Sequence, residues 1–276
     1  MEEPFRGRRD AFLRKVRRRP AVMGILNVTP DSFFDGGQFQ TIEGATLHAK
    51  KLVADGCDIV DIGAESTRPG AVPVSEAEEL ARVEPILSAL ARRLDAPLSI
   101  DTTKARVAAR ALACGAIAVN DVGGLQRDAA MADVVAAAEA LIVIVHNRAE
   151  KDESIDIIPD IRAFFDRSLT LADKAGIARE RIILDPGIGF AKTSRQNRDA
   201  VARLGELKDY RLPIMVGVSR KSFLGSLMDG NPEASLIGTV AANLAAAARG
   251  AAIFRVHDVA EHVAALKVFH AIRGTS

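Results

Sequence analysis

Apolar segments rich in Val and Ile recur eight times along this chain, each ends on a polar or charged side chain, and a helical pattern usually follows. In a (β/α)8 barrel the carboxyl ends of the parallel strands lie on one face, where side chains from different strands meet. The sequence therefore predicts an α/β protein with a (β/α)8 TIM barrel fold and a site at the barrel mouth. The segments end at Asn27, Asp61, Asp101, Asn120, His146, Asp185, Ser219–Lys221 and Arg255–His257.

Strands and helices are expected to alternate. The strands are predicted at 22–28, 59–62, 98–101, 116–120, 141–145, 182–185, 214–218 and 252–256. Helical periodicity is found near 43–55, 75–94, 104–113, 128–139, 160–175, 195–208, 233–249 and 258–272. Uniformly apolar strands indicate burial on both faces. An open doubly wound sheet is the main alternative, but its functional groups concentrate near one switch point.

The length of 276 residues suits one barrel of about 250 residues. We expect a single barrel domain over residues 21–276, preceded by a basic, solvated extension at residues 1–20. The net charge of +1 gives no general attraction to nucleic acid, so no nucleic-acid partner is expected.

Cysteine usage and hydropathy indicate a cytoplasmic protein with no membrane partner. Cys57 and Cys114 are the only cysteines and form no metal-binding pattern, as expected in a reducing compartment. No apolar segment approaches the ~20 residues that cross a bilayer, and the first residues lack the apolar core of a signal peptide.

Two connections, 29–41 and 64–74, are too long for simple turns after a strand. They contain Gly36-Gly37, Pro69-Gly70 and Pro73, which combine hinges with stiff segments. Long loops in compact barrels are commonly lids or binding loops.

One corner of the expected mouth brings together Asn27, Arg255 and His257, because barrel closure makes the last strand the neighbour of the first. Two potential cations and an amide oxygen suit a phosphate, with the Asn27 oxygen as a ligand to Mg²⁺ that bridges diphosphate oxygens. The alternative is structural: Arg255 pairs with a helix carboxylate, and His257 caps the last helix.

Across the barrel, Asp101, Asn120 and Asp185 are expected to form a ring of hydrogen-bond acceptors. Burying one unpaired polar group costs about 1–3 kcal/mol, so a heterocycle with adjacent N–H groups would suit this ring. Asp185 can accept two parallel N–H bonds from a guanidine-like edge. Its alternative role is that of a turn residue before Pro186-Gly187.

Lys221 and Ser222 follow the seventh expected strand at the start of a helical pattern. Backbone N–H groups there can hold a carboxylate or phosphate, to which Ser222 adds a hydroxyl. Helix capping is an equally simple reading, and a Schiff-base role for Lys221 is a weaker competitor.

Five ordered motifs together resemble dihydropteroate synthase, and the resemblance runs from about Val22 to the C-terminus. It implies condensation of 6-hydroxymethyl-7,8-dihydropterin diphosphate with p-aminobenzoate to 7,8-dihydropteroate and diphosphate, with Mg²⁺ as cofactor and a homodimer through the Ala-rich late helices. The motifs are Gly24–Phe33, Glu65–Gly70, Asp185–Phe190, Ser219–Ser222 and Arg255–Asp258.

The resemblance also assigns residues to subsites. It implies pterin binding by Asp101, Asn120, Asp185 and Lys221. It implies diphosphate binding by Asn27, Arg255 and His257, with Asn27 as metal ligand, and p-aminobenzoate binding by Thr67, Arg68, Pro69, Phe190 and Ser222. The expected catalytic groups are Asp101, Lys221, Arg255 and His257.

The implied chemistry is a dissociative substitution, in which diphosphate leaves before the aryl amine attacks a pterin methylene cation. The sequence departs from the family pattern at Asn147, at Ala191 and at Ala234-Ser235, while the five motifs are intact. Two alternatives are a methyltetrahydrofolate-dependent methyltransferase and a non-catalytic pterin-binding protein. The Ser-Thr-Arg-Pro-Gly loop and the Ser-Arg-Lys-Ser turn argue against the methyltransferase.

Overall fold

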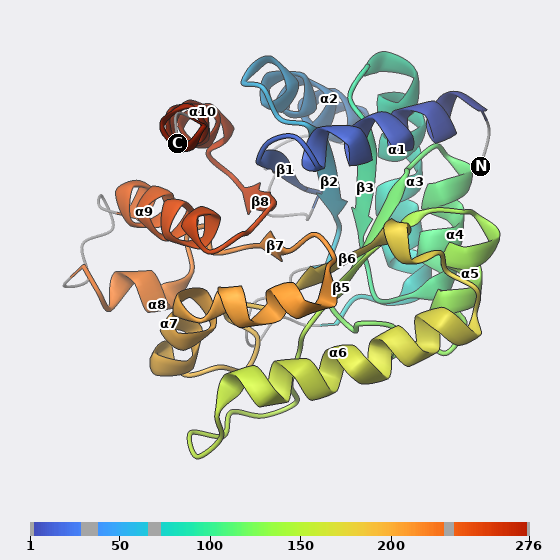
Figure 1. Cartoon of the computed structure of the whole chain (residues 1–276). Coiled ribbons are helices and arrows are strands. Elements are labelled where there is room, and N and C mark those ends of the chain that lie inside the picture. Colours follow the sequence, from blue (N-terminus) through green and yellow to red (C-terminus); the bar gives the residue numbers. More distant parts are fainter. Residues whose placement is uncertain (1–2, 29–37, 66–72, 229–234, 275–276) are drawn as a thin grey trace.

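Eight parallel strands form one sheet in the order β6-β5-β4-β3-β2-β1-β8-β7. The structure is a computed structural model that describes residues 3–28, 38–65, 73–228 and 235–274. An isolated parallel bridge between Leu184 and Ile214 links the two ends of this order. The backbone N–H of Leu184 also donates to Pro213 O at 3.0 Å, so the sheet closes as the predicted (β/α)8 barrel (Figure 1).

The strands begin and end close to the predicted positions, except that β7 is shorter than expected. Its ladder covers Met215–Val216, and residues 217–218 have no regular secondary structure. The strands are β1 (Ala21–Asn27), β2 (Ile59–Gly63), β3 (Leu98–Asp101), β4 (Ala118–Asp121), β5 (Leu141–Val145), β6 (Ile182–Asp185), β7 (Met215–Val216) and β8 (Ile253–Val256).

Helices cover the outside of the barrel, and an additional helix precedes β1. The helix α2 begins at Gln38, earlier than the predicted residue 43, so the first long connection is shorter than expected. The helices are α1 (Glu3–Val16), α2 (Gln38–Ala54), α3 (Glu76–Arg93), α4 (Ala105–Ala113), α5 (Met131–Ala137), α6 (Ile157–Lys174), α7 (Ser194–Ala202), α8 (Ser222–Gly225), α9 (Ser235–Ala248) and α10 (Val259–Arg273), with 3-10 turns at Arg179–Arg181 and Leu204–Tyr210.

Residues two apart on each strand point to the same side of the sheet. One set of positions fills the barrel interior, in a cluster separate from the larger core between strands and helices. The next position along each strand on the same side is often polar, so the interior passes from an apolar floor to a polar mouth. The floor contains Met23, Ile59, Leu141, Ile183, Met215 and Ile253.

Helix α1 lies across the end of the barrel where the strands begin. Phe12 and Val16 are 2% and 7% exposed and join the interior apolar cluster. Arg9 donates to Glu139 O at 2.6 Å, and Arg19 donates to both oxygens of Asp58 at 2.7 and 3.0 Å. The prediction of a solvated extension is therefore wrong for the apolar face of α1, because the barrel floor needs a cover.

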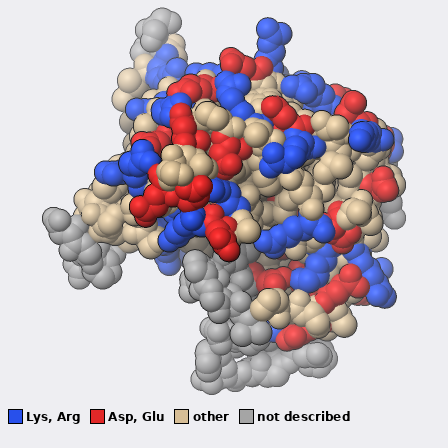
Figure 2. Space-filling view, turned by 90° about the horizontal axis from the view of Figure 1, so that it is seen from below, with Lys and Arg blue, Asp and Glu red and all other residues tan. Residues whose placement is uncertain are grey.

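The surface carries mixed charge. Figure 2 shows basic and acidic side chains interspersed over the face in view. Among the described helices, none is long and apolar enough to cross a membrane.

Candidate active site

The alternation of strand side chains assembles the site at the mouth. Asp61 lies two residues beyond the floor residue Ile59, Asp185 two beyond Ile183, and Arg255 two beyond Ile253. The register of the parallel ladder pairs Asp101 with Asn120 on β3 and β4 and pairs Gly63 with Asp101 on β2 and β3. The polar strand ends thus face the same space without any special loop geometry.

Arg255 forms two charged hydrogen bonds inside the mouth. Its Nε lies 2.7 Å from Asp61 Oδ2, and its Nη2 lies 2.7 Å from Asp101 Oδ2. Arg255 therefore pairs with carboxylates on strands, whereas a helix carboxylate was the expected structural alternative. The sequence predicts Arg255 in the diphosphate corner and Asp101 in a separate ring of acceptors across the barrel. Their hydrogen bond shows that the two groups are in contact.

Asn120 completes this network as a donor. Its Nδ2 donates to Asp61 Oδ2 at 3.0 Å, and the side chain is 2% exposed. Within the described part of the structure, Asn120 Oδ1 and Asp61 Oδ1 are buried and have no hydrogen-bond partner. Unpaired buried acceptors are costly, so these two oxygens are suited to accept N–H groups of a ligand.

Burial raises the pKa of Asp101 to about 7, against the opposing effect of the Arg255 cation and with further increase from Asp61. Asp101 can therefore change its protonation near neutral pH. Perturbed carboxyls in a polar cleft are candidates for catalytic or ligand-binding groups.

Asp185 is held by the turn that follows β6. Its Oδ1 accepts the Gly187 N–H at 2.7 Å, and Gly187 has a φ of +65°, which favours glycine. Burial raises the pKa of Asp185, while this hydrogen bond and the nearby Lys221 and Lys192 lower it. The expected turn role and a ligand-binding role are compatible here, because the second carboxylate oxygen is not used by the turn contact.

Lys221, which directly precedes α8, contacts the same turn after β6. Its ammonium donates to Ile188 O and lies 4.7 Å from the centroid of the Phe190 ring. Burial lowers the pKa of Lys221 to about 8, although Asp185 raises it. Phe190 and Lys221, predicted in different subsites, are therefore in contact.

His257 and Asn27 lie near the junction of β8 and β1, which pair in parallel as expected. His257 Nδ1 is 2.9 Å from Ser219 Oγ, and this hydroxyl also accepts the His257 N–H at 3.3 Å. Asn27 is the exposed last residue of β1. Asp258, rather than His257, occupies the N-cap position of α10.

Some predicted residues lie away from the network at the mouth or outside the described residues. Ser222 begins the four-residue helix α8 and is exposed. Thr67, Arg68 and Pro69 lie outside the described residues. His146 points away from the barrel interior and is 1% exposed, beside Asp160 and the ring of Phe164.

A partly buried ion network at the base of the second long connection was not predicted. Lys104 Nζ lies 2.5 Å from Glu65 Oε2 and 2.5 Å from Glu79 Oε2, and Glu79 is fully buried. Glu65 Oε1 also accepts the Val74 N–H at 3.2 Å, which fixes the two ends of the connection together. Lys104 lies three residues after the end of β3, and this place near a strand end was the available sequence signal.

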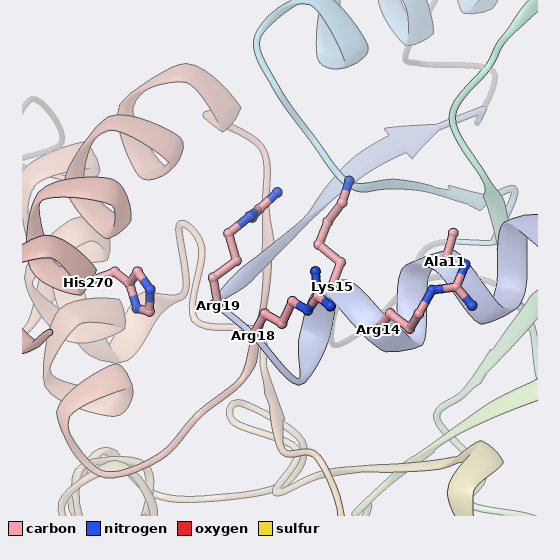
Figure 3. A pocket seen from close by; sticks show the side chains of 6 residues that line it. All are labelled: Ala11, Arg14, Lys15, Arg18, Arg19 and His270. Carbon is pink, nitrogen blue, oxygen red and sulfur yellow. The ribbon is translucent and has the colours of Figure 1, made fainter.

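A basic groove lies at the other end of the barrel, between α1 and α10 (Figure 3). Asp58 pairs there with Lys15 and Arg19. The groove lies at the end of the barrel where the strands begin, and the polar strand ends lie at the opposite end. It is therefore not the candidate active site. Its lining residues are Ala11, Arg14, Lys15, Arg18, Arg19 and His270.

Comparison with known proteins decides the family. The sequence pattern of the family described as "Pterin binding enzyme" matches residues 23–257. The dihydropteroate synthase of Bacillus subtilis (strain 168) is 43% identical over 256 residues, which are 93% of this chain and 90% of that protein. The chain belongs to the dihydropteroate synthase family.

Solved structures agree. A dihydropteroate synthase from Clostridium difficile, solved in the presence of pteroic acid, superposes with a TM-score of 0.90 at 46% identity, covering 92% of this chain and 97% of that chain. One from Xanthomonas albilineans, solved with 4-aminobenzoic acid, has a TM-score of 0.89 at 42% identity, covering 93% and 94%. The predicted function is confirmed: the chain is a pterin-binding transferase of folate biosynthesis.

Proposed function

We propose that the dihydropteroate synthase reaction takes place at this mouth, with the pterin held by Asp101, Asn120, Asp185 and Lys221. The observation that carries the proposal is the pair of unpartnered buried oxygens, Asn120 Oδ1 and Asp61 Oδ1. A pterin offers adjacent ring and amino N–H groups that would satisfy such acceptors. Asp61 therefore joins the expected pterin residues, since it already orients Asn120 and Arg255.

The diphosphate would lie at the junction of β8 and β1, against Asn27, Arg255 and His257. Burial lowers the pKa of Arg255, but Asp61 and Asp101 raise it above its ordinary value, so the side chain carries its positive charge at all ordinary pH values. His257 is oriented by Ser219. A guanidinium and an imidazole at one corner suit an anionic leaving group.

Mg²⁺ is the proposed cofactor, and Asn27 fits a role as its protein ligand. The exposed side chain of Asn27 offers one hard oxygen, and Mg²⁺ in proteins usually combines few protein oxygens with water and substrate phosphate. When bound, Mg²⁺ would neutralise charge on the diphosphate.

The p-aminobenzoate site is proposed beside Phe190 and Ser222, together with Thr67, Arg68 and Pro69. Phe190 offers a ring face next to the Lys221 ammonium. The network of Glu65, Lys104 and Glu79 supports this position, because it fixes the two ends of the connection that carries Thr67–Pro69.

We propose a dissociative substitution at this site. The C–O bond to diphosphate breaks first, and the leaving electron pair stays on the diphosphate next to Arg255 and His257. The Asp101 carboxylate, once ionised, stabilises the pterin methylene cation. Two unit charges about 4 Å apart interact by about 4 kcal/mol at an effective dielectric of 20, which corresponds to about a thousandfold in rate. The amine nitrogen of p-aminobenzoate then attacks the methylene carbon to form the C–N bond and releases its proton to water.

Positional isotope exchange tests this sequence of events. Pterin diphosphate carrying ¹⁸O in the bridging position is incubated with the enzyme and Mg²⁺ without p-aminobenzoate. Bond cleavage before amine attack moves the label into non-bridging positions or releases diphosphate. The control is that the same enzyme sample forms product at the normal rate once p-aminobenzoate is added. If that sample leaves the ¹⁸O label in the bridging position and releases no diphosphate before the addition, the dissociative order is contradicted.

We also propose a homodimer through α9 and α10, which contact each other at one side of the barrel (Figure 1). Ile237 on α9 is 72% exposed, and Val268 on α10 is 59% exposed. Large exposed apolar side chains on adjacent helices are typical of an interface. Light scattering of the wild type and of Ile237→Lys tests this assignment, with a monomeric wild type as the contradicting result. A cytoplasmic location and the absence of nucleic-acid and membrane partners stay predictions.

A further inference from the structure

Lys192 is a buried basic side chain that no subsite described above uses. Burial and the neighbouring Lys221 lower its pKa to about 7, against the opposing effect of Asp185, so the ammonium form is present at and below neutral pH. Its side chain is 3% exposed, and its ammonium has three N–H donors. These face three acceptors: Gly187 O at 2.7 Å, His146 Nδ1 at 2.8 Å and Phe190 O at 3.4 Å. A buried ammonium needs such partners because its desolvation is costly.

His146 is held in the form that this contact requires. Its Nε2 lies 3.1 Å from Asp160 Oδ2 at the start of α6. A neutral ring that donates from Nε2 to Asp160 leaves Nδ1 as an acceptor for Lys192. Burial lowers the pKa of His146 to about 4, which agrees with the neutral ring. The chain Asp160–His146–Lys192 thus connects α6 to the turn after β6.

This turn carries two residues of the proposed substrate site. The Gly187 N–H donates to Asp185 Oδ1 at 2.7 Å, while Gly187 O accepts from Lys192. A Cβ at Gly187 would lie 1.7 Å from His146 O, so the turn is folded closely against the end of β5. Phe190 lies at the end of this turn, and its backbone carbonyl is the third acceptor of Lys192.

We propose that Lys192, held by His146 and Asp160, is a positioning residue for substrate binding. Its ammonium holds Gly187 and Phe190 from the outer side of the turn, and this fixes the direction of the Asp185 carboxylate and the place of the Phe190 ring. Lys192 itself does not touch substrate. The inference rests on the proposed pterin contact of Asp185.

Steady-state kinetics of Lys192→Met tests the proposal. We expect the KM for pterin diphosphate to rise about tenfold, as for loss of one hydrogen bond to a charged group, with kcat changed by less than about threefold. Lys174→Met, at an exposed position on α6, is the matched control and should leave both constants unchanged. A purely structural role would lower the melting temperature and the active fraction but not change KM.

Two His146 variants keep the test valid if Lys192→Met fails to fold. His146→Asn retains a hydrogen-bond acceptor for Lys192, so its KM for pterin diphosphate should stay close to that of the wild type. His146→Leu removes the acceptor and should raise KM. Wild-type KM in folded Lys192→Met or in His146→Leu would overturn the proposal.

Asp185→Asn separates this inference from the role of Asp185. If Asp185→Asn raises KM and Lys192→Met does not, the positioning role alone fails. If Asp185→Asn leaves KM unchanged, the proposed pterin contact fails, and the positioning role fails with it.

Discussion

The Nη2 of Arg255 lies 2.7 Å from Oδ2 of Asp101, so the guanidinium of the mouth and a carboxyl whose pKa burial raises to about 7 are one ion pair. The two residues come from β8 and β3, strands that are not neighbours in the sheet. The pair spans the barrel interior and connects the proposed diphosphate corner to the proposed pterin pocket. A change of charge on either side chain must therefore be felt by the other.

Asp101→Asn should preserve binding of pterin diphosphate and lose most turnover. The amide keeps the shape and can still accept from Arg255, but it cannot stabilise a cation by its charge. We expect kcat to fall between about a hundredfold and a thousandfold, with Kd for the pterin substrate changed much less. Calorimetry and product formation give these two quantities separately.

The matched control is Asp173→Asn, which removes an exposed carboxylate from α6. Its kcat should equal that of the wild type. Near-normal turnover of Asp101→Asn would remove Asp101 from the cation-stabilising role.

The pH dependence of kcat/KM should be bell-shaped with its maximum near pH 7, because the ammonium of Lys192, whose pKa burial lowers to about 7, is also lost on the alkaline side. Burial raises the pKa of Asp101 to about 7, so activity rises as the pH increases through this value and the carboxylate forms. Burial lowers the pKa of Lys221 to about 8, so activity falls at higher pH as the ammonium is lost. In Asp101→Asn the acid limb should disappear from the residual activity. If kcat/KM of the wild-type enzyme does not change with pH below about 7, this assignment of the acid limb to Asp101 is contradicted.

Phe12→Ala should destabilise the protein without altering the site. Phe12 is 2% exposed and packs into the floor of the barrel from α1, so its truncation should cost about 3–5 kcal/mol. Denaturant unfolding measures this loss, and Leu47→Ala, at a position 72% exposed, is the control. Equal stability of the two variants would mean that α1 does not contribute to the barrel core.

Sulfonamides should inhibit competitively with p-aminobenzoate, because they resemble it in size, ring and charge. The segment Thr67-Arg68-Pro69 is uninterrupted in the sequence. Initial rates at several concentrations of both compounds measure the pattern. Full activity at saturating sulfonamide would refute the proposed p-aminobenzoate site.

The fold could be predicted because strand periodicity and strand ends are local properties of the sequence. Asp101 and Asp185 end β3 and β6 at the predicted residues, and their inward direction follows from the position of Ile183 and Ser99 two residues earlier. The register then brings Asp101 level with Asn120.

The contacts within the site could not be predicted in the same way. The direction of the Arg255 side chain depends on carboxylates 194 and 154 residues away in the chain, Asp61 and Asp101. The network of Lys104 with Glu65 and Glu79 is similarly non-local. Helix α1 was misjudged because the eight basic residues among residues 1–20 indicated a solvated segment, although the same segment contains the buried apolar residues Phe12 and Val16.

The most direct test is a single incubation of the purified protein with pterin diphosphate, Mg²⁺ and p-aminobenzoate, in which dihydropteroate and diphosphate are measured together. We predict that both products form in equal amounts, and that Asp101→Asn forms both more slowly than the wild type. Binding of pterin diphosphate without either product would contradict it and would indicate a non-catalytic pterin-binding protein.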